Sequence, residues 1–263
     1  MTWLRSAAKA LFAAVDAFVP TPSGPRILIY HQVGAGLGRQ MEVTTKNFEL
    51  QLEWLADNRE VVDLQTAVER WTDHDSERLV VVTFDDGYRD TFETAFPRLE
   101  RRGMPFVLYL ATESVDTGQS LGPGVGAEPL SWTMIESMVN SGLLTIGAHT
   151  HTHLDLRDAA PSQIEHEIAT SNAVISSRLG IDPLHFAYPW GYWSEEAAPI
   201  VKAHYSTAVL GGSARPKPEP SKHQLNRYPV QLSDGVVFFK SRVKGGLLLE
   251  EAVRRRIRGY SGP

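Results

Sequence analysis

The sequence has no cysteine, little excess charge and no long hydrophobic run. Among its 263 residues, the absence of cysteine excludes disulfides and thiolate metal ligands, so any bound metal must be held by histidines and carboxylates. The formal net charge of −5 gives no electrostatic reason for nucleic-acid binding, and we expect no nucleic-acid partner. No apolar run approaches the ~20 residues that a helix needs to cross a bilayer.

Residues 1–24 predict an amphipathic helix followed by a linker of Pro, Ser and Gly. Apolar side chains fall on one helical face: Leu4, Ala7, Ala8, Leu11, Ala14, Val15 and Phe18. Asp16 interrupts what would be the apolar region of a signal peptide, so a cytoplasmic or membrane-peripheral location is favoured over secretion. Two interpretations stay open: a helix docked on its own domain, and a peripheral contact with a membrane surface.

The rest of the chain alternates short apolar strands with amphipathic helices. No low-complexity divider interrupts this alternation, which predicts one α/β domain with a parallel sheet or barrel. Strands are expected at 27–33, 106–110 and 143–148, and helices at 88–102, 131–140 and 161–179. About seven strand–helix units fit a barrel better than an open sheet. Residues 233–263 are expected to form a basic helical extension.

Two adjacent carboxylates stand at the end of the most apolar strand. Four apolar residues at 79–82 lead into Asp85 and Asp86, and Gly87 follows. A short apolar run of this kind is typical of a buried parallel strand. Burying two carboxylates is costly unless something neutralises them, and a metal ion is the usual partner.

A histidine-rich segment at 149–153 supplies the other ligands that a metal would need. His149 and His153 share a side whether the segment is extended or helical, because both periodicities bring positions i and i+4 together. Two histidines with one carboxylate suit Zn²⁺ or another divalent first-row ion and leave positions open for water and substrate.

Together, the Thr-Phe-Asp-Asp-Gly motif at 83–87 and the His-Thr-His-Thr-His motif at 149–153 resemble the polysaccharide deacetylase family, also called the NodB-homology domain. Segments 26–33, 186–191 and 225–230 resemble one branch, whose members deacetylate exopolysaccharides such as poly-N-acetylglucosamine. The resemblance covers roughly residues 25–232, which we take as the domain. It implies a distorted (β/α)7 barrel.

The resemblance also implies roles for single residues. Asp86, His149 and His153 correspond to ligands of a divalent ion, for which Zn²⁺ is favoured and Co²⁺, Ni²⁺ and Fe²⁺ are alternatives. Asp85 corresponds to the general base and His31 to the general acid. His151 is read as a neighbour of the ligands, not as one of them.

The loop at 187–193 departs from the family pattern. Many members carry an arginine here, near the base, whereas this chain has none; we hypothesise that Arg227 orients Asp85 instead. The resemblance assigns the backbone N–H of Trp190 to the oxyanion of the transition state. The side chains of Tyr188, Trp190 and Trp193 are expected to stack on sugar rings.

These features predict a metal-dependent hydrolase that removes N-acetyl groups from amino sugars of a polysaccharide or glycolipid. An O-acetyl esterase, or another non-peptide amide hydrolase, stays open because amide and ester hydrolysis use the same oxyanion chemistry. A catalytically silent carbohydrate-binding protein is the third interpretation. The intact set of acids and histidines argues against it.

Overall fold

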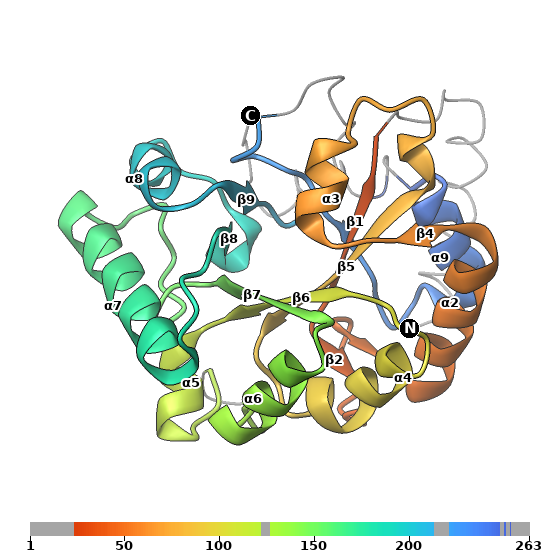
Figure 1. Ribbon diagram of the computed structural model, residues 1–263, viewed down its shortest axis with the longest axis horizontal. Coiled ribbons are helices and arrows are strands. Elements are labelled where there is room, and N and C mark those ends of the chain that lie inside the picture. The colour runs from red at the N-terminus through yellow and green to blue at the C-terminus, as the bar shows by residue number, and fades with distance from the viewer. Residues whose placement is uncertain (1–23, 122–126, 213–220, 248–249, 251–252, 254–263) are drawn as a thin grey trace.

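A curled parallel sheet forms the centre of the computed structural model (Figure 1), which describes residues 24–121, 127–212, 221–247, 250 and 253. Its strands run in the order β10-β1-β5-β6-β7-β8-β9, and β4 pairs with the start of β5. The strands are β1 (Arg26–Tyr30), β4 (Glu60–Val61), β5 (Leu79–Asp86), β6 (Phe106–Leu110), β7 (Leu144–Ala148), β8 (His185–Ala187), β9 (Thr207–Val209) and β10 (Tyr228–Pro229).

The sheet curls back on itself through the segment that leads into β10. Leu225 receives a hydrogen bond from the N–H of Leu210 at 2.8 Å, and its own N–H donates to Ala208 at 3.0 Å, so this segment lies along β9. Three residues later β10 pairs with β1, the strand at the opposite side of the sheet. The predicted distorted barrel is therefore confirmed.

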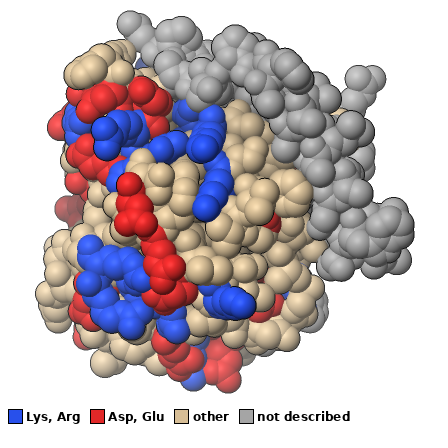
Figure 2. Space-filling model, turned by 90° about the vertical axis from the view of Figure 1, so that its right-hand side faces the viewer, with Lys and Arg blue, Asp and Glu red and all other residues tan. Residues whose placement is uncertain are grey.

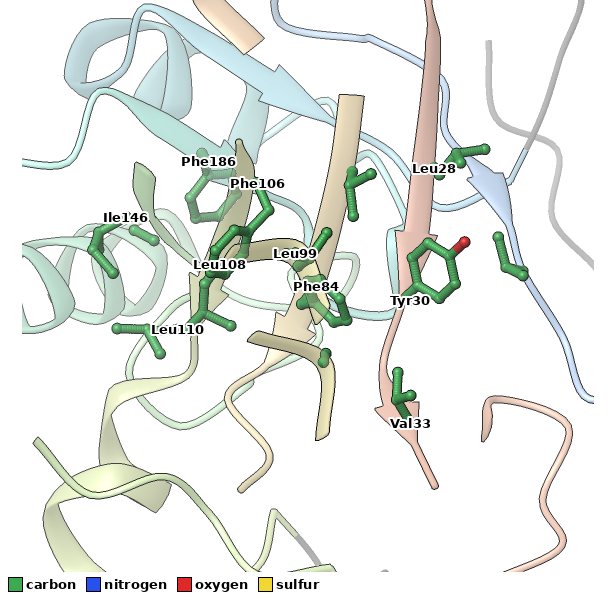
Figure 3. Packing of buried hydrophobic residues seen from close by; sticks show 14 of the residues in the cluster. Leu28, Tyr30, Val33, Phe84, Leu99, Phe106, Leu108, Leu110, Ile146 and Phe186 are labelled. Carbon is green, nitrogen blue, oxygen red and sulfur yellow. The ribbon is translucent and has the colours of Figure 1, made fainter. Parts of the chain in front are cut away.

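Both faces of the sheet are buried, as expected for parallel strands. Along β5, Val80, Val82 and Phe84 belong to the larger hydrophobic cluster. Figure 3 shows Phe84 in this cluster beside side chains of β1 and β6. The alternate residues Leu79 and Val81 belong to a second cluster on the other face. Asp85 lies on the same face of β5 as Leu79 and Val81, at the carboxyl end of the strand, so its side chain points into the interior of the barrel.

Helices surround the sheet. They are α2 (Thr45–Asn58), α3 (Leu64–Glu69), α4 (Phe96–Glu100), α5 (Thr112–Thr117), α6 (Trp132–Asn140), α7 (Pro161–Leu179), α8 (Ala197–His204) and α9 (Gly235–Val243). Local sequence fixes several ends: the Ser131 hydroxyl caps α6 by accepting from the N–H of Met134, and Gly180 ends α7 at φ 67°. In the described ranges, no helix is long and apolar enough to cross a membrane.

Three expectations need correction. The strand predicted over 27–33 breaks at His31: β1 ends at Tyr30, and β2 (Gln32–Val33) pairs with β3 (Glu42–Val43) in a separate small sheet. The single helix predicted over 88–102 is a turn, a π-helical segment Thr91–Ala95 and the short α4. The helix α5 was not expected, whereas α9 lies within residues 233–263, for which a helical extension was predicted.

The ends of the chain remain predictions. The amphipathic helix of residues 1–24 lies almost wholly outside the described residues, as does most of the predicted basic extension beyond residue 247. The boundary expected at residue 232 is untested as well. The helix α9, which follows that boundary, packs against α2, with the rings of Trp54 and Phe239 6.1 Å apart at their centroids.

Acidic and basic side chains are intermixed over the face of the molecule in Figure 2. One cluster joins α2 to α4: Glu49 forms ion pairs with Arg98, Arg101 and Arg102. Such partly exposed pairs contribute only about 0–1 kcal/mol each to stability.

Candidate active site

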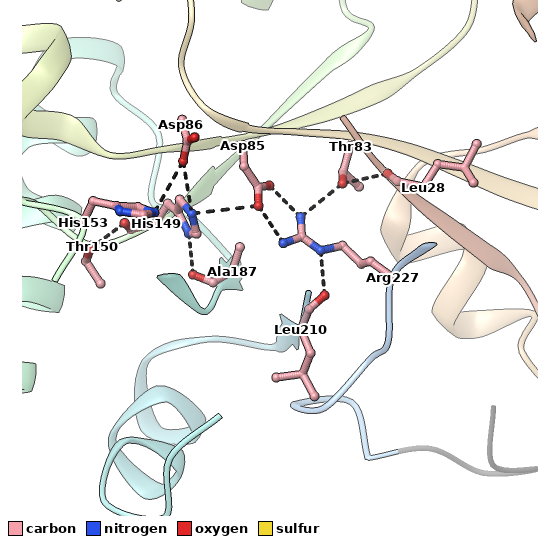
Figure 4. Close-up of polar contacts among 10 residues, drawn as sticks. All are labelled: Leu28, Thr83, Asp85, Asp86, His149, Thr150, His153, Ala187, Leu210 and Arg227. Atoms are coloured by element: carbon pink, nitrogen blue, oxygen red, sulfur yellow. Dashed lines mark hydrogen bonds and ion pairs between the residues drawn. The ribbon is translucent and has the colours of Figure 1, made fainter. Parts of the chain in front are cut away.

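Strand ends bring the candidate residues together at the carboxyl edge of the sheet (Figure 4). Asp85 and Asp86 end β5, His149 follows β7 directly, and His31 follows β1. Arg227 immediately precedes β10. In β/α barrels, the side chains that carry chemistry gather at this end because the loops there converge from several strands.

Asp86, His149 and His153 form a compact set of possible metal ligands. One side-chain atom of each lies within 4.8 Å of the others. The Nε2 atoms of both histidines are 3.5 Å from Oδ1 of Asp86. That oxygen is buried, and no described group forms a hydrogen bond with it. A buried carboxylate oxygen facing two imidazole nitrogens fits a bound cation, so the donor set suits a divalent first-row metal.

The hydrogen bond of His149 to the protein fixes its tautomer. Its Nδ1 lies 2.7 Å from the carbonyl oxygen of Ala187. A carbonyl can only accept, so Nδ1 carries the hydrogen and, in the neutral imidazole, Nε2 directs its lone pair toward Asp86. For the second histidine, burial, followed by the neighbouring His149, lowers the pKa of His153 to about 4. His153 is therefore neutral at neutral pH, as a ligand must be.

The acid at this site is ionised. Burial alone would raise the pKa of Asp86, but the neighbouring imidazoles of His149, His31 and His153 outweigh it and hold the pKa well below its usual range. Conversely, burial lowers the pKa of His149, and the two aspartates more than offset this, leaving its pKa above the ordinary value. In the absence of a metal, charge is thus shared between buried acids and imidazoles.

Backbone strain is concentrated at the same place. Asp86, Thr150, His153 and Trp190 all have positive φ angles, between 61° and 75°. Such left-handed conformations cost about 1–3 kcal/mol each for residues other than glycine and persist where surrounding structure imposes them. At Asp86 the angle of 75° turns the chain away from the strand path. As a result both adjacent carboxylates approach His149, whereas in a regular strand they would point to opposite faces.

Asp85 is held by Arg227 in a two-pronged ion pair. The two terminal guanidinium nitrogens each donate to one carboxylate oxygen at 2.6 Å. Burial raises the pKa of Asp85, but the Arg227 charge, with His149 next, brings it below the ordinary value. Oδ2 of this carboxylate is also 3.8 Å from Nε2 of His149, so Asp85 faces the candidate metal ligands.

Arg227 is itself fixed by its surroundings. Its Nε donates to the carbonyl of Leu210 at 2.9 Å, and one terminal nitrogen also donates to Thr83 at 3.2 Å. The ring of Tyr109 lies against the guanidinium, 5.3 Å from its carbon. Gly147 makes room for that ring, because a Cβ there would come within 2.4 Å of it.

His31 lies in the electrostatic field of the same cluster. Burial, opposed by the charges of Asp86 and Asp85, lowers its pKa from the ordinary value. The break between β1 and β2 falls at this residue, so the chain that carries it is free of strand pairing there. The structure thus brings His31 together with both acids and with His149.

The 188–193 loop presents one exposed aromatic side chain beside the ligands. Trp190 is 62% exposed, and its ring centroid lies 5.1 Å from that of His153. The loop can lie so close to the end of β9 because Gly191 and Gly211 meet without side chains; a Cβ on Gly191 would come within 2.3 Å of the Gly211 Cα.

Residues 72–209, more than half of the chain, match the family model described as polysaccharide deacetylase. The chain belongs to the polysaccharide deacetylase family. YxkH of Bacillus subtilis (strain 168), which carries the name polysaccharide deacetylase, is 27% identical over 219 residues, or 82% of this chain and 74% of that protein.

Solved structures share the fold of this deacetylase. IcaB from Ammonifex degensii superimposes with a TM-score of 0.72 at 24% identity, covering 85% of this chain and 97% of that one. BC0361, a polysaccharide deacetylase from Bacillus cereus, has a TM-score of 0.69 at 25% identity, covering 84% and 69%. The distorted barrel predicted from the motifs is thus that of known deacetylases.

The prediction that the side chain of Tyr188 contacts substrate is wrong for this deacetylase, because that side chain is not at the surface. Tyr188 is fully buried, and its ring packs edge-on against Phe186 at 5.3 Å, so it cannot stack on a sugar. Trp193 packs partly against the main core cluster. Of the three aromatics, Trp190 alone presents a mostly exposed ring. His151 donates or accepts at Thr112 and stands outside the ligand set, as expected.

The sequence analysis did not identify two residues that support the site. Tyr109 supports Arg227 from the middle of an apolar strand. Glu167 receives hydrogen bonds from the histidine loop although it lies in the middle of α7. Nothing in the local pattern of either residue distinguishes it from a core aromatic or a helix-surface acid.

The ligand geometry predicts that the purified protein binds one divalent ion through Asp86, His149 and His153. Each ligand changed to Ala should reduce the zinc content to background, because two remaining ligands hold an ion weakly. His151→Ala is the matched control and should keep its zinc. Elemental analysis after equilibrium dialysis measures this. Full zinc content in His153→Ala would refute the ligand assignment.

Proposed function

We propose that this deacetylase is a metal-dependent hydrolase that removes N-acetyl groups from amino sugars of a polysaccharide or glycolipid. The observation that carries the proposal is the unpartnered Oδ1 of buried Asp86, which faces two imidazole nitrogens next to the ionised carboxylate of Asp85. The donor set favours Zn²⁺, with Co²⁺, Ni²⁺ or Fe²⁺ as alternatives.

Asp86, His149 and His153 would hold the ion. When bound there, a divalent ion lowers the pKa of water and polarises a carbonyl. The protein's contribution is to turn all three ligand atoms to one point and, at Asp86 and His153, to favour the deprotonated form. The bond from His149 Nδ1 to Ala187 supports this for one ligand, and the low pKa of His153 supports it for another.

Asp85 is the proposed general base. Its two oxygens accept from Arg227, and each retains a second lone pair. Oδ2 lies on the side of His149, so it is the oxygen that we expect to take the proton of the attacking water. Arg227 lowers the basicity of the carboxylate, but in return it holds the base in one orientation. Positioned proton transfer of this kind typically contributes ~10²–10⁴-fold to the rate.

His31 is the proposed general acid and protonates the leaving amine. It approaches the cluster from β1, across from the β7 loop that carries His149 and His153. Two proton-transfer groups on different strands can act on opposite sides of a bound amide. The backbone N–H of Trp190 is the proposed donor to the oxyanion; a fixed backbone donor of this kind requires no reorganisation as charge develops.

The side chain of Trp190 is the proposed contact for a neighbouring sugar ring. Its exposed ring stands beside His153, so a sugar adjacent to the reacting one could stack on it. This interpretation favours a glycan of more than one residue. It does not separate an N-acetyl from an O-acetyl group, and the assay must do that.

Acetate release tests the proposed reaction. We expect release from N-acetylglucosamine oligomers, none after chelation, and recovery when Zn²⁺ is restored. Asp85→Asn and His31→Ala should each lower turnover ~10²–10⁴-fold while keeping the metal. Asp57→Asn, an exposed acid of α2, is the control and should behave as wild type. Faster release from acetylated xylan would instead establish an O-acetyl esterase.

Changing Trp190 tests the sugar contact. Trp190→Ala keeps the backbone N–H but removes the ring, so use of a tetramer should fall more than use of the single sugar. Trp190→Phe keeps an aromatic face and should retain most of the preference for the tetramer. Specificity constants for both lengths measure this. Equal losses on the two substrates would rule out stacking by Trp190.

A further inference from the structure

The loop between the two candidate histidine ligands is held by a single carboxylate from outside the site. Glu167 lies on α7 and is only 6% exposed. Its Oε2 accepts from the backbone N–H groups of His151 and Thr152, both at 2.8 Å, and its Oε1 accepts from the Thr152 hydroxyl at 2.8 Å. All three donors lie between His149 and His153 in the sequence.

The backbone of this loop needs such a partner. Thr150 and His153 both adopt left-handed conformations, with φ of 65° and 61°. Between them, two successive N–H groups point outward together, and a backbone turn of this kind forms a small anion-binding concavity. A carboxylate in that concavity makes charge-assisted hydrogen bonds, which are stronger than neutral ones. Glu167 therefore stabilises a loop shape that the residues themselves disfavour.

The opposite side of the loop is held by α5. The N–H groups of Thr112 and Glu113 donate to the carbonyls of Thr150 and His151, at 3.4 and 2.9 Å. The helices α5 and α7 pack against each other at the left of Figure 1. The loop is thus fixed between the start of α5 and the buried acid of α7.

The two candidate ligands differ in what holds them. His149 is tied to the strand by its N–H, which donates to Leu110 at 3.0 Å, and by its Nδ1, which donates to Ala187. His153 has no comparable anchor: within the described ranges its ring pairs with Asp86 and contacts the rings of His149 and Trp190, but no hydrogen bond fixes its orientation. The direction of its Nε2 must therefore come from the loop that precedes it.

We propose that Glu167 is the positioning residue of the metal centre: it fixes the loop so that His153 faces Asp86. This proposal rests on the proposed metal site. Glu167 is buried and forms its hydrogen bonds with residues 151 and 152, not with the donor atoms of the candidate ligands, so it acts through the loop. Partners at this remove from a metal typically change affinity by ~10–100-fold when lost.

Zinc affinity of the full chain, measured by competition with a chromophoric chelator, tests the proposal. Glu167→Met keeps the length of the side chain but cannot accept the three hydrogen bonds, so it should bind Zn²⁺ ~10–100-fold more weakly. Glu167→Gln should stay within a few-fold of wild type, because its amide oxygen can accept both N–H groups and its amide nitrogen can donate to Thr152.

Two further variants keep the test decisive if Glu167→Met folds poorly. Thr152→Val removes one of the three bonds at an exposed position and should weaken zinc binding several-fold. Glu165→Met is the matched control; this exposed acid of α7 pairs with His204 at 2.8 Å, and its loss should leave zinc affinity unchanged.

The outcomes distinguish this inference from the proposed function. A wild-type protein that binds no zinc would overturn the metal site itself. A wild type that binds zinc, with Glu167→Met and Thr152→Val binding it equally tightly, would overturn the positioning role alone. Equal weakening by Glu165→Met, or a Glu167→Gln variant as weak as Glu167→Met, would also contradict it.

Discussion

The constraint on which the site depends is the burial of two neighbouring carboxylates at the end of one strand. Each must be compensated, and the protein compensates them differently. Arg227 satisfies both oxygens of Asp85, whereas Oδ1 of Asp86 is left facing two histidines without a hydrogen bond. An unpaired buried charge of this kind is costly, so the asymmetry is the clearest sign that a cation belongs beside Asp86.

The barrel makes this arrangement stable enough to exist. Its parallel strands bring the acids and the histidines to one edge, and the side chain of Arg227 reaches Asp85 from the start of β10. The packed structure around the left-handed residues imposes their strained conformations. A second group of residues supports the candidate site. Tyr109 and Thr83 contact Arg227, which in turn binds Asp85, and Glu167 fixes the loop that carries His153. The groups expected to do chemistry therefore depend on buried residues outside the set of candidate ligands.

Through the family resemblance the motifs predicted the barrel, and they identified the candidate acids and histidines because apolar strands ending in Asp-Asp and His-x-x-x-His are local patterns. They could not predict that Tyr188 turns inward, since its burial depends on how Phe186 of β8 packs against both Tyr188 and Tyr205. Nor could they reveal Glu167 or the turn at Asp86, because both depend on contacts or backbone angles set by distant segments. Local sequence patterns therefore predict which motif residues come together, whereas tertiary packing determines the orientation of their side chains.

The most direct test of this account is the position of the metal in crystals of the zinc-loaded protein, located by anomalous scattering at the zinc edge. The account predicts one strong peak at ~2.0–2.2 Å from Oδ1 of Asp86 and from Nε2 of both His149 and His153. A peak bound elsewhere, or none with Oδ1 of Asp86 hydrogen-bonded to water, would contradict the claim that a cation completes this buried carboxylate.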